Sequence, residues 1–128
     1  MADLPGAGAA GGLGFAFMLL GAQRVAGIDV VREAVGLDDA IAGSDLVVTG
    51  EGSFDWQSLR GKAVSGLAAA ALDQGRPLVV IAGRVEVGRR EYAALGITEA
   101  YAIGEEPGPN PAAVLARAAA RVADQWSR

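Results

Sequence analysis

The sequence predicts an α/β fold, a three-layer, Rossmann-like partial domain in which helices cover the faces of a mostly parallel sheet. Short apolar runs of strand length alternate with helical patterns, the order expected of parallel strands joined by crossover helices. The run 78–82 is continuously apolar, as in a strand buried on both faces. A composition of 52% hydrophobic residues with 19 glycines suits such layers. We therefore expect residues 1–128 to form a single α/β domain or domain fragment.

The first third of the chain is expected to be helical after a glycine-rich loop. The spacing of apolar residues predicts a helix over 13–26, which Gly27 ends. The residues expected to face inward from this helix are Phe15, Met18, Leu19 and Ala22. A second short helix is predicted over 28–35, with Asp29 as its N-cap and Gly36 closing it, followed by a helical turn over 37–42.

Strands and helices then alternate to the end of the chain. Strands are predicted over 45–49, 78–82 and 99–103, and helices over about 59–74, 87–94 and 112–126. The buried face of the helix over 59–74 is expected to comprise Leu59, Val64, Leu67, Ala71 and Leu72. The last helix is amphipathic, and its expected inward residues are Val114, Leu115, Ala118, Val122 and Trp126.

Composition and charge exclude several classes of function. The chain has no histidine and no cysteine, so it offers no catalytic triad, thiolate chemistry or disulfide framework of its own. Its formal charge is −4 and its 11 lysines and arginines are scattered, unlike the basic stripe of a nucleic-acid-binding protein. The apolar run 13–22 is too short to span a bilayer, so we expect no membrane partner. The absence of cysteine fits a reducing cytosol, and we expect a cytoplasmic location.

Two carboxylates dominate the polar stretch after the first predicted strand. Glu51 lies between Gly50 and Gly52, where the bare backbone on either side would let a ligand approach a side chain held at the end of the strand. Asp55 follows four residues later, and the two could share a Mg²⁺ ion or divide the work between metal and proton. The alternative is ordinary turn chemistry, with Asp55 as an N-cap or Asx-turn residue.

Lys62 follows Gly61 at the start of the next helix, where the helix dipole disfavours a cation. This local conflict favours an anionic ligand such as a phosphate, although a solvated surface lysine is the alternative. Gln57, Ser53 and Ser58 could donate hydrogen bonds to a ligand or serve only as loop residues. Carboxylates, glycines and one lysine around the end of a strand favour phosphoryl chemistry.

The N-terminal glycines allow two interpretations. Gly6, Gly8 and Gly11 match a dinucleotide-binding fingerprint, but the motif needs a preceding strand, for which four residues leave no room. We expect instead that they let the loop pack closely and open a helix, whose N–H groups could still hold an anion. A nicotinamide-binding domain is therefore the weakest alternative.

A family resemblance is carried by the run 45–52, by Asp55 and Gln57, by Gly61 and Lys62, and by 66–68. These residues, in this order, resemble the signature of the type I glycerate kinase family, and 5–14 and 79–83 resemble its neighbouring elements. The resemblance implies ATP-dependent phosphorylation of D-glycerate to 2- or 3-phosphoglycerate with Mg²⁺.

The resemblance also implies roles for individual residues. Glu51 and Asp55 would bind Mg²⁺ or the substrate hydroxyl, and Lys62 would meet a phosphate or the glycerate carboxylate. The residues expected to bind substrate or nucleotide are Thr49, Gly50, Gly52, Ser53, Gln57, Gly61, Gly6, Gly8 and Gly11.

Two departures from the family bear on function. Ser53 stands where a basic residue is common, and Arg60 nearby could compensate for the lost charge. Family members are considerably longer and have a second lobe, so the chain resembles their C-terminal third, and we expect little activity from it alone. The other possibility is a noncatalytic α/β ligand-binding or assembly module, completed by an N-terminal lobe or by a homodimer partner.

Overall fold

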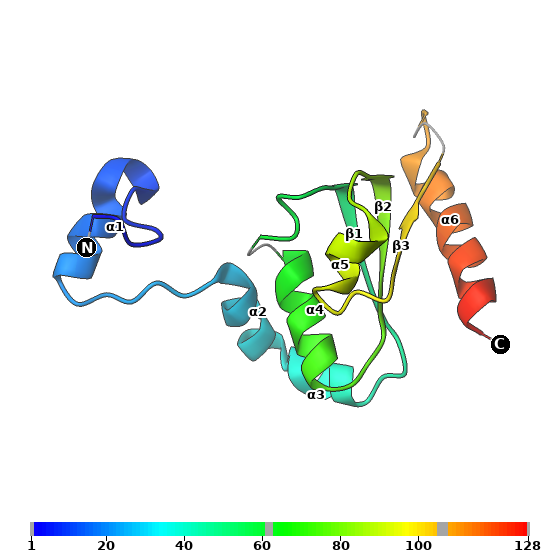
Figure 1. Cartoon of the computed structure of the whole chain (residues 1–128), viewed down its shortest axis with the longest axis horizontal. Coiled ribbons are helices and arrows are strands. Elements are labelled where there is room, and N and C mark those ends of the chain that lie inside the picture. The colour runs from blue at the N-terminus through cyan, green and yellow to red at the C-terminus, as the bar shows by residue number, and fades with distance from the viewer. Residues whose placement is uncertain (1, 61–62, 105–107, 128) are drawn as a thin grey trace.

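The computed structural model describes residues 2–60, 63–104 and 108–127, and it confirms the predicted α/β fold. Three parallel strands, β1 (Val47–Phe54), β2 (Leu78–Val85) and β3 (Glu99–Ala102), form a sheet in the order β1-β2-β3 (Figure 1). In the register, Glu51 of β1 lies opposite Ala82 of β2, and Ala82 lies opposite Ala102 of β3. Glu51 therefore belongs to the hydrogen-bonded part of the sheet.

Helices pack on both faces of the sheet and make three layers, as predicted. The crossover helices α4 (Ala63–Asp73) and α5 (Arg89–Ala93) lie on one face, where their side chains join Val80 and Ala82 in one core cluster. Helix α6 (Pro111–Trp126) covers the other face at Val79 and Ile81. Both crossover helices lie on the same face because the strands follow one another in order across the sheet and both connections have the same handedness.

Helix α6 confirms most of the predicted amphipathic pattern. The side-chain oxygen of Asn110 accepts a hydrogen bond from the N–H of Ala113 at 3.1 Å and caps the helix. The buried stripe is Val114, Ala118 and Val122. Leu115 was expected to face inward, but 47% of it is exposed because it lies one residue off this stripe.

Strand β1 is longer than predicted. The sequence indicated a strand over 45–49, but β1 continues through the glycines to Phe54, which is fully buried. The low strand propensity of glycine is overridden here by pairing with β2 and by close packing of the two backbones. A Cβ atom added at Gly83 would lie 2.6 Å from the carbonyl oxygen of Gly52, so only glycine fits at this point of the ladder.

Helix α4 begins later than predicted, at Ala63 rather than near Leu59, because residues 55–60 form a turn. The predicted burial of Val64 and Ala71 is confirmed, while Leu67 and Leu59 are partly buried beside the core. The prediction for Leu72 is wrong, since 58% of it is exposed. Like β1, β2 extends past its predicted end at Ala82, to Val85.

The N-terminal helix differs most from expectation. Helix α1 spans Ala9–Leu19 instead of 13–26, and it lies apart from the sheet (Figure 1). It contains no buried residue, so the predicted inward face does not pack against a core, and 59% of Leu19 is exposed. Three of its residues, Ala10, Gly11 and Gly12, have positive φ values that interrupt the helical path.

Helices α2 (Gly27–Val35) and α3 (Leu37–Ala42) follow along an extended connection. Gly27 begins α2 rather than ending the helix before it, and the N-cap is Ala26 rather than the predicted Asp29. Gly36 ends α2 in the left-handed conformation, as predicted, with φ of 61°. Within the described residues, no helix is both long and apolar enough to cross a membrane.

Candidate functional site

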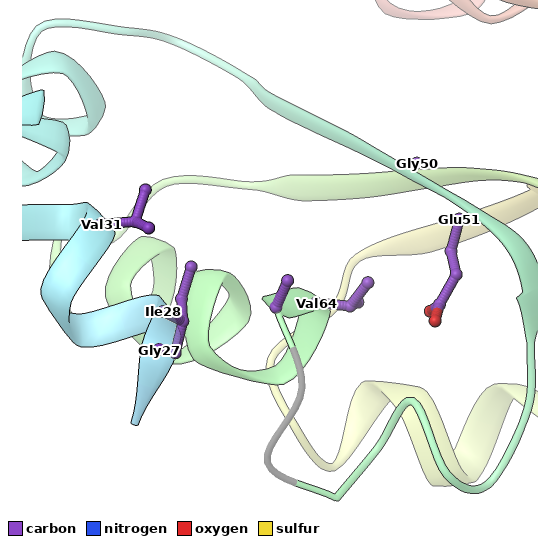
Figure 2. Close-up of a pocket in the computed structure, with 7 residues that line it drawn as sticks. Gly27, Ile28, Val31, Gly50, Glu51 and Val64 are labelled. Carbon is purple, nitrogen blue, oxygen red and sulfur yellow. The ribbon is translucent and has the colours of Figure 1, made fainter. Parts of the chain in front are cut away.

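A cavity of about 590 Å³ opens between β1, α2 and the first turn of α4 (Figure 2). Its described lining residues are Gly27, Ile28, Val31, Gly50, Glu51, Ala63 and Val64. Among these, Glu51 contributes the single charged or polar side chain. The cavity therefore presents one carboxylate against apolar walls, a lining typical of small-molecule sites.

Glu51 is positioned by the register of β1. Because Glu51 pairs with Ala82, its side chain shares the sheet face that α4 covers, and Figure 2 shows its carboxylate turned toward Val64 at the start of that helix. One oxygen, Oε2, is buried and has no hydrogen-bond partner among the described residues. Buried polar atoms normally have partners, so this oxygen is available to a ligand hydroxyl or a cation.

The neighbours of Glu51 in β1 alternate between the two faces. Thr49, opposite Val80, shares the face of Glu51 and is half-buried. Gly50 borders the cavity through its backbone, and a Cβ atom added there would lie 3.1 Å from the carbonyl oxygen of Ile81. An added Cβ at Gly52 would meet nothing within 4 Å, so the backbone is open there, on the face opposite the side chain of Glu51.

In the turn after β1, Asp55 has the structural role given above as the alternative, that of an Asx-turn residue. Its Oδ1 accepts hydrogen bonds from the N–H groups of Gln57 at 2.8 Å and Ser58 at 3.3 Å, as in an Asx turn. The buried Ser58 hydroxyl accepts from the Asp55 N–H and donates to the Ser53 carbonyl oxygen, both at 3.3 Å. Asp55 therefore shapes the turn, and a further role in binding stays a prediction.

Two cationic residues near the turn, Arg60 and Lys62, were expected to contact an anionic ligand. Arg60 stacks over the ring of Trp56, with its guanidinium carbon 5.4 Å from the ring centroid. Gly61 and Lys62 lie outside the described residues, but Ala63, which follows Lys62 directly in the sequence, lines the cavity.

A metal site made of protein ligands alone is absent from the described residues, which contain no group of three or more Asp or Glu side chains able to hold an ion. Mg²⁺ is commonly held by one or two carboxylates together with water and substrate phosphates. The unpartnered oxygen of Glu51 fits that type of site, with Asp55 as the second candidate ligand.

The N-terminal glycines lie elsewhere. Gly6 borders a separate hollow of about 370 Å³ that shares no lining residue with the Glu51 cavity. Residues 2–8 form turns and bends, so the dinucleotide fingerprint through Gly6, Gly8 and Gly11 lacks its strand. Close packing was expected at these three glycines, but a Cβ added at Gly8 or Gly11 would meet nothing within 4 Å, and one at Gly6 would lie 3.0 Å from the side chain of Arg24.

Sequence reasoning did not identify the α2 wall of the cavity, which Gly27, Ile28 and Val31 provide. The available signal was the three-residue spacing of Ile28 and Val31, which places them on one side of a helix. That spacing is also typical of a core-facing helix, so it did not indicate a site.

A second polar cluster joins α5 to the start of β3. The buried Tyr92 hydroxyl donates a hydrogen bond to Oε1 of Glu99, and Arg89 lies 3.6 Å from the other carboxylate oxygen. Burial, and then the bond to Glu99, raise the pKa of Tyr92 above its usual value. The same bond is the main cause that lowers the pKa of Glu99. None of these residues lines the Glu51 cavity, and their contacts connect α5 to the start of β3.

Comparison with known proteins gives consistent matches. The model of the glycerate kinase family matches residues 1–128. The chain is 48% identical over 82 residues to the glycerate 2-kinase of Escherichia coli strain K12, covering 63% of this chain and 22% of that protein. It is 38% identical over 104 residues to a glycerate kinase of Halalkalibacterium halodurans, covering 80% of this chain and 27% of that one.

A crystal structure from Salmonella typhimurium LT2, assigned provisionally as glycerate kinase 2, aligns with 97% of this chain and 34% of its own, with a TM-score of 0.62 and 31% identity. The chain thus spans about a quarter of the length of these curated relatives and about a third of the solved structure. The match of the family model over the whole chain, together with these relatives, shows that the chain belongs to the glycerate kinase family.

Proposed function

We propose that this chain carries the acid-bearing part of the active site of an ATP-dependent glycerate kinase, which phosphorylates D-glycerate to 2- or 3-phosphoglycerate. The observation that supports this most is the buried oxygen of Glu51, which has no partner among the described residues and lies at an apolar cavity in a chain of this family. Such an oxygen gains a partner when a hydroxyl or a cation binds.

In the proposed reaction a hydroxyl oxygen of D-glycerate bonds to the γ-phosphorus of ATP as the bond from that phosphorus to the β,γ-bridging oxygen breaks. ADP leaves, and the hydroxyl proton needs an acceptor. Glu51 is proposed as that acceptor or as a metal ligand, and Lys62 as a contact to a phosphate or to the glycerate carboxylate. The backbone at Gly50, which lines the cavity, and at Gly52, where an added Cβ would meet nothing within 4 Å, would let a ligand approach closely.

Further residues are proposed to contact substrate or nucleotide. They are Thr49, Ser53, Gln57 and Gly61, with Gly6, Gly8 and Gly11 from the N-terminal segment. For Mg²⁺, the proposed holders are Glu51 and Asp55, and the ion when bound neutralises charge on the phosphate oxygens. A cytoplasmic location, where ATP is available, fits this chemistry.

We also propose that the chain corresponds to the C-terminal portion of a type I enzyme. Since it spans about a quarter of its curated relatives, binding groups from outside these 128 residues are expected to complete the site. The chain alone should then bind ligands but turn over little substrate, because phosphoryl transfer depends on positioning from all sides.

The test is a coupled ATP-consumption assay with D-glycerate and Mg²⁺, first on this chain and then on this chain mixed with the N-terminal two-thirds of a full-length relative. D-Glycerate-dependent ATP consumption that appears only in the mixture would support the proposal. Activity of the chain alone would mean that the site is self-contained. Ligand binding without turnover in either sample would favour the alternative, a noncatalytic α/β binding or assembly module.

A further inference from the structure

The apolar wall opposite Glu51 comes from one short helix. The first two turns of α2 contribute Gly27, Ile28 and Val31 to the cavity, yet α2 contains no buried residue. The helix is therefore not held by buried side chains. The width of the cavity depends on the few contacts between α2 and its neighbouring helices.

One of these contacts is an interlocked pair formed by Ile28 of α2 and Gly66 of α4. A Cβ atom added at Gly66 would lie 2.6 Å from Cγ2 and 2.9 Å from Cγ1 of Ile28. The missing side chain at Gly66 thus provides the space that the branched side chain of Ile28 occupies (Figure 2 shows Ile28 beside α4). Any larger residue at 66 would have to push Ile28 away from α4.

The middle of α2 is held by charge. Arg32 donates to both carboxylate oxygens of Asp38 on α3, over 2.9 to 3.1 Å, and lies 3.6 Å from Asp29. This bidentate bond between exposed side chains joins α2 to α3, and the contact between Ile28 and Gly66 joins its first turn to α4. Displacing Ile28 would therefore act first on the wall of the cavity at the start of α2.

We propose that Ile28 is a specificity-determining residue of this site and that Gly66 is the residue that positions it. The inference rests on the proposed function, because it concerns the hydroxy acid that Glu51 would receive. With a substrate hydroxyl at Glu51, the carbon chain of the acid extends along an apolar wall that offers no competing polar side chain among the described lining residues. Ile28 would disfavour an acid that carries a further carbon toward this wall.

The variants test the two roles separately. Ile28→Ala removes three carbons from the wall and should admit (2R)-2,3-dihydroxybutanoate, which carries one more apolar carbon than D-glycerate, improving its affinity relative to D-glycerate by about tenfold, the usual effect of one carbon in an apolar pocket. Val30→Ala is the matched control, because Val30 lies on the same helix, is 55% exposed and does not line the cavity. It should leave the ratio of the two dissociation constants unchanged.

Gly66→Ala should push Ile28 from its place and weaken D-glycerate binding by about tenfold. The double variant Gly66→Ala with Ile28→Ala should restore the affinity to within about twofold of Ile28→Ala alone, because the colliding atoms are gone. The melting temperature should fall in Gly66→Ala and recover in the double variant, which verifies that the two residues collide. A general loss of folding would not be repaired by deleting a second apolar side chain.

The experiment is an NMR titration of the 128-residue chain with D-glycerate and (2R)-2,3-dihydroxybutanoate, following amide shifts and dissociation constants. A shifted affinity ratio in Ile28→Ala, with none in Val30→Ala, supports the inference. An unchanged ratio in Ile28→Ala, while D-glycerate still shifts the Glu51 amide, overturns the inference and leaves the proposed function standing. If D-glycerate shifts no amide around Glu51 in the unaltered chain, the proposed function fails, and the inference fails with it.

Discussion

Substituting Gly83 by alanine should loosen the end of the sheet that carries Glu51. The added Cβ would lie 2.6 Å from the carbonyl oxygen of Gly52, a backbone atom that cannot rotate away, so β1 and β2 must separate locally. Overpacking of this kind costs about 1–3 kcal/mol. The alanine also reduces the entropy of the unfolded chain, which returns about 0.4–1 kcal/mol.

The matched control is Gly52→Ala, on the opposite side of the same contact, where an added Cβ meets nothing within 4 Å. The glycine-to-alanine change lowers the entropy of the unfolded chain equally in both variants. The difference between their unfolding free energies therefore measures the cost of the collision alone, about 1–3 kcal/mol. At roughly 3–6 °C per kcal/mol for a chain of this length, Gly83→Ala should melt at least about 3 °C below Gly52→Ala. Thermal and urea unfolding followed by circular dichroism measure this, and equal melting temperatures would refute the packing argument.

Two further predictions concern the core and the hydrogen bond between Tyr92 and Glu99. Phe54→Ala removes a fully buried ring and should cost about 3–5 kcal/mol in urea unfolding, whereas Leu20→Ala, at a side chain 84% exposed, should change stability by under about 0.5 kcal/mol; similar losses would contradict the assignment of the core. The hydrogen bond from Tyr92 to Glu99 should make stability depend on pH at both ends of the range. Since the pKa of Glu99 is lowered, its contribution is complete above the ordinary value of 4.5 and is lost as the pH falls through the folded value. Since the pKa of Tyr92 is raised, its contribution is complete below the ordinary value of 10.0 and is lost as the pH rises through the folded value. In Tyr92→Phe, the urea concentration at the unfolding midpoint should fall less steeply at acid pH and at alkaline pH than in the unaltered chain. An unchanged pH profile would show that this hydrogen bond contributes nothing to stability.

The arrangement of layers could be predicted from the sequence because it depends on local pattern. Continuous apolar runs such as 78–82 have few alternatives to a buried parallel strand, and the three-to-four-residue spacing of Val114, Ala118 and Val122 defines the buried stripe of α6. The left-handed Gly36, which ends α2, was an equally local feature. These elements agree in propensity, capping and packing, which makes them predictable.

The end of β1 could not be predicted in the same way. Residues 50–53 resemble a turn, with two glycines and a charge, and only their pairing with β2 makes them a strand. The prediction for helix α1 was wrong because its tertiary contacts differ from those that its pattern indicates. Its apolar spacing favours a core-facing helix, but the described chain places no partner against it, so Leu19 stays exposed.

The candidate site was predictable in part. Glu51 was identified by its flanking glycines, and the structure places it at a cavity with an unpartnered oxygen. Asp55 allowed two interpretations that residue type alone could not separate, and its hydrogen bonds to the turn show one of them. The wall formed by Ile28 could not be predicted, because it depends on a tertiary contact between α2 and α4, which are far apart in the sequence. A glycine at position 66 does not by itself indicate which side chain packs against it.

The most direct test of the account is the effect of Glu51→Gln on D-glycerate-dependent ATP consumption, measured with this chain mixed with the N-terminal two-thirds of a full-length relative. Glu33→Gln, at an exposed position on α2 outside the cavity, is the matched control. We predict a loss of at least about a hundredfold in turnover for Glu51→Gln and none for Glu33→Gln. Near-normal turnover in Glu51→Gln would contradict the central claim that the cavity at Glu51 is the site of phosphoryl transfer.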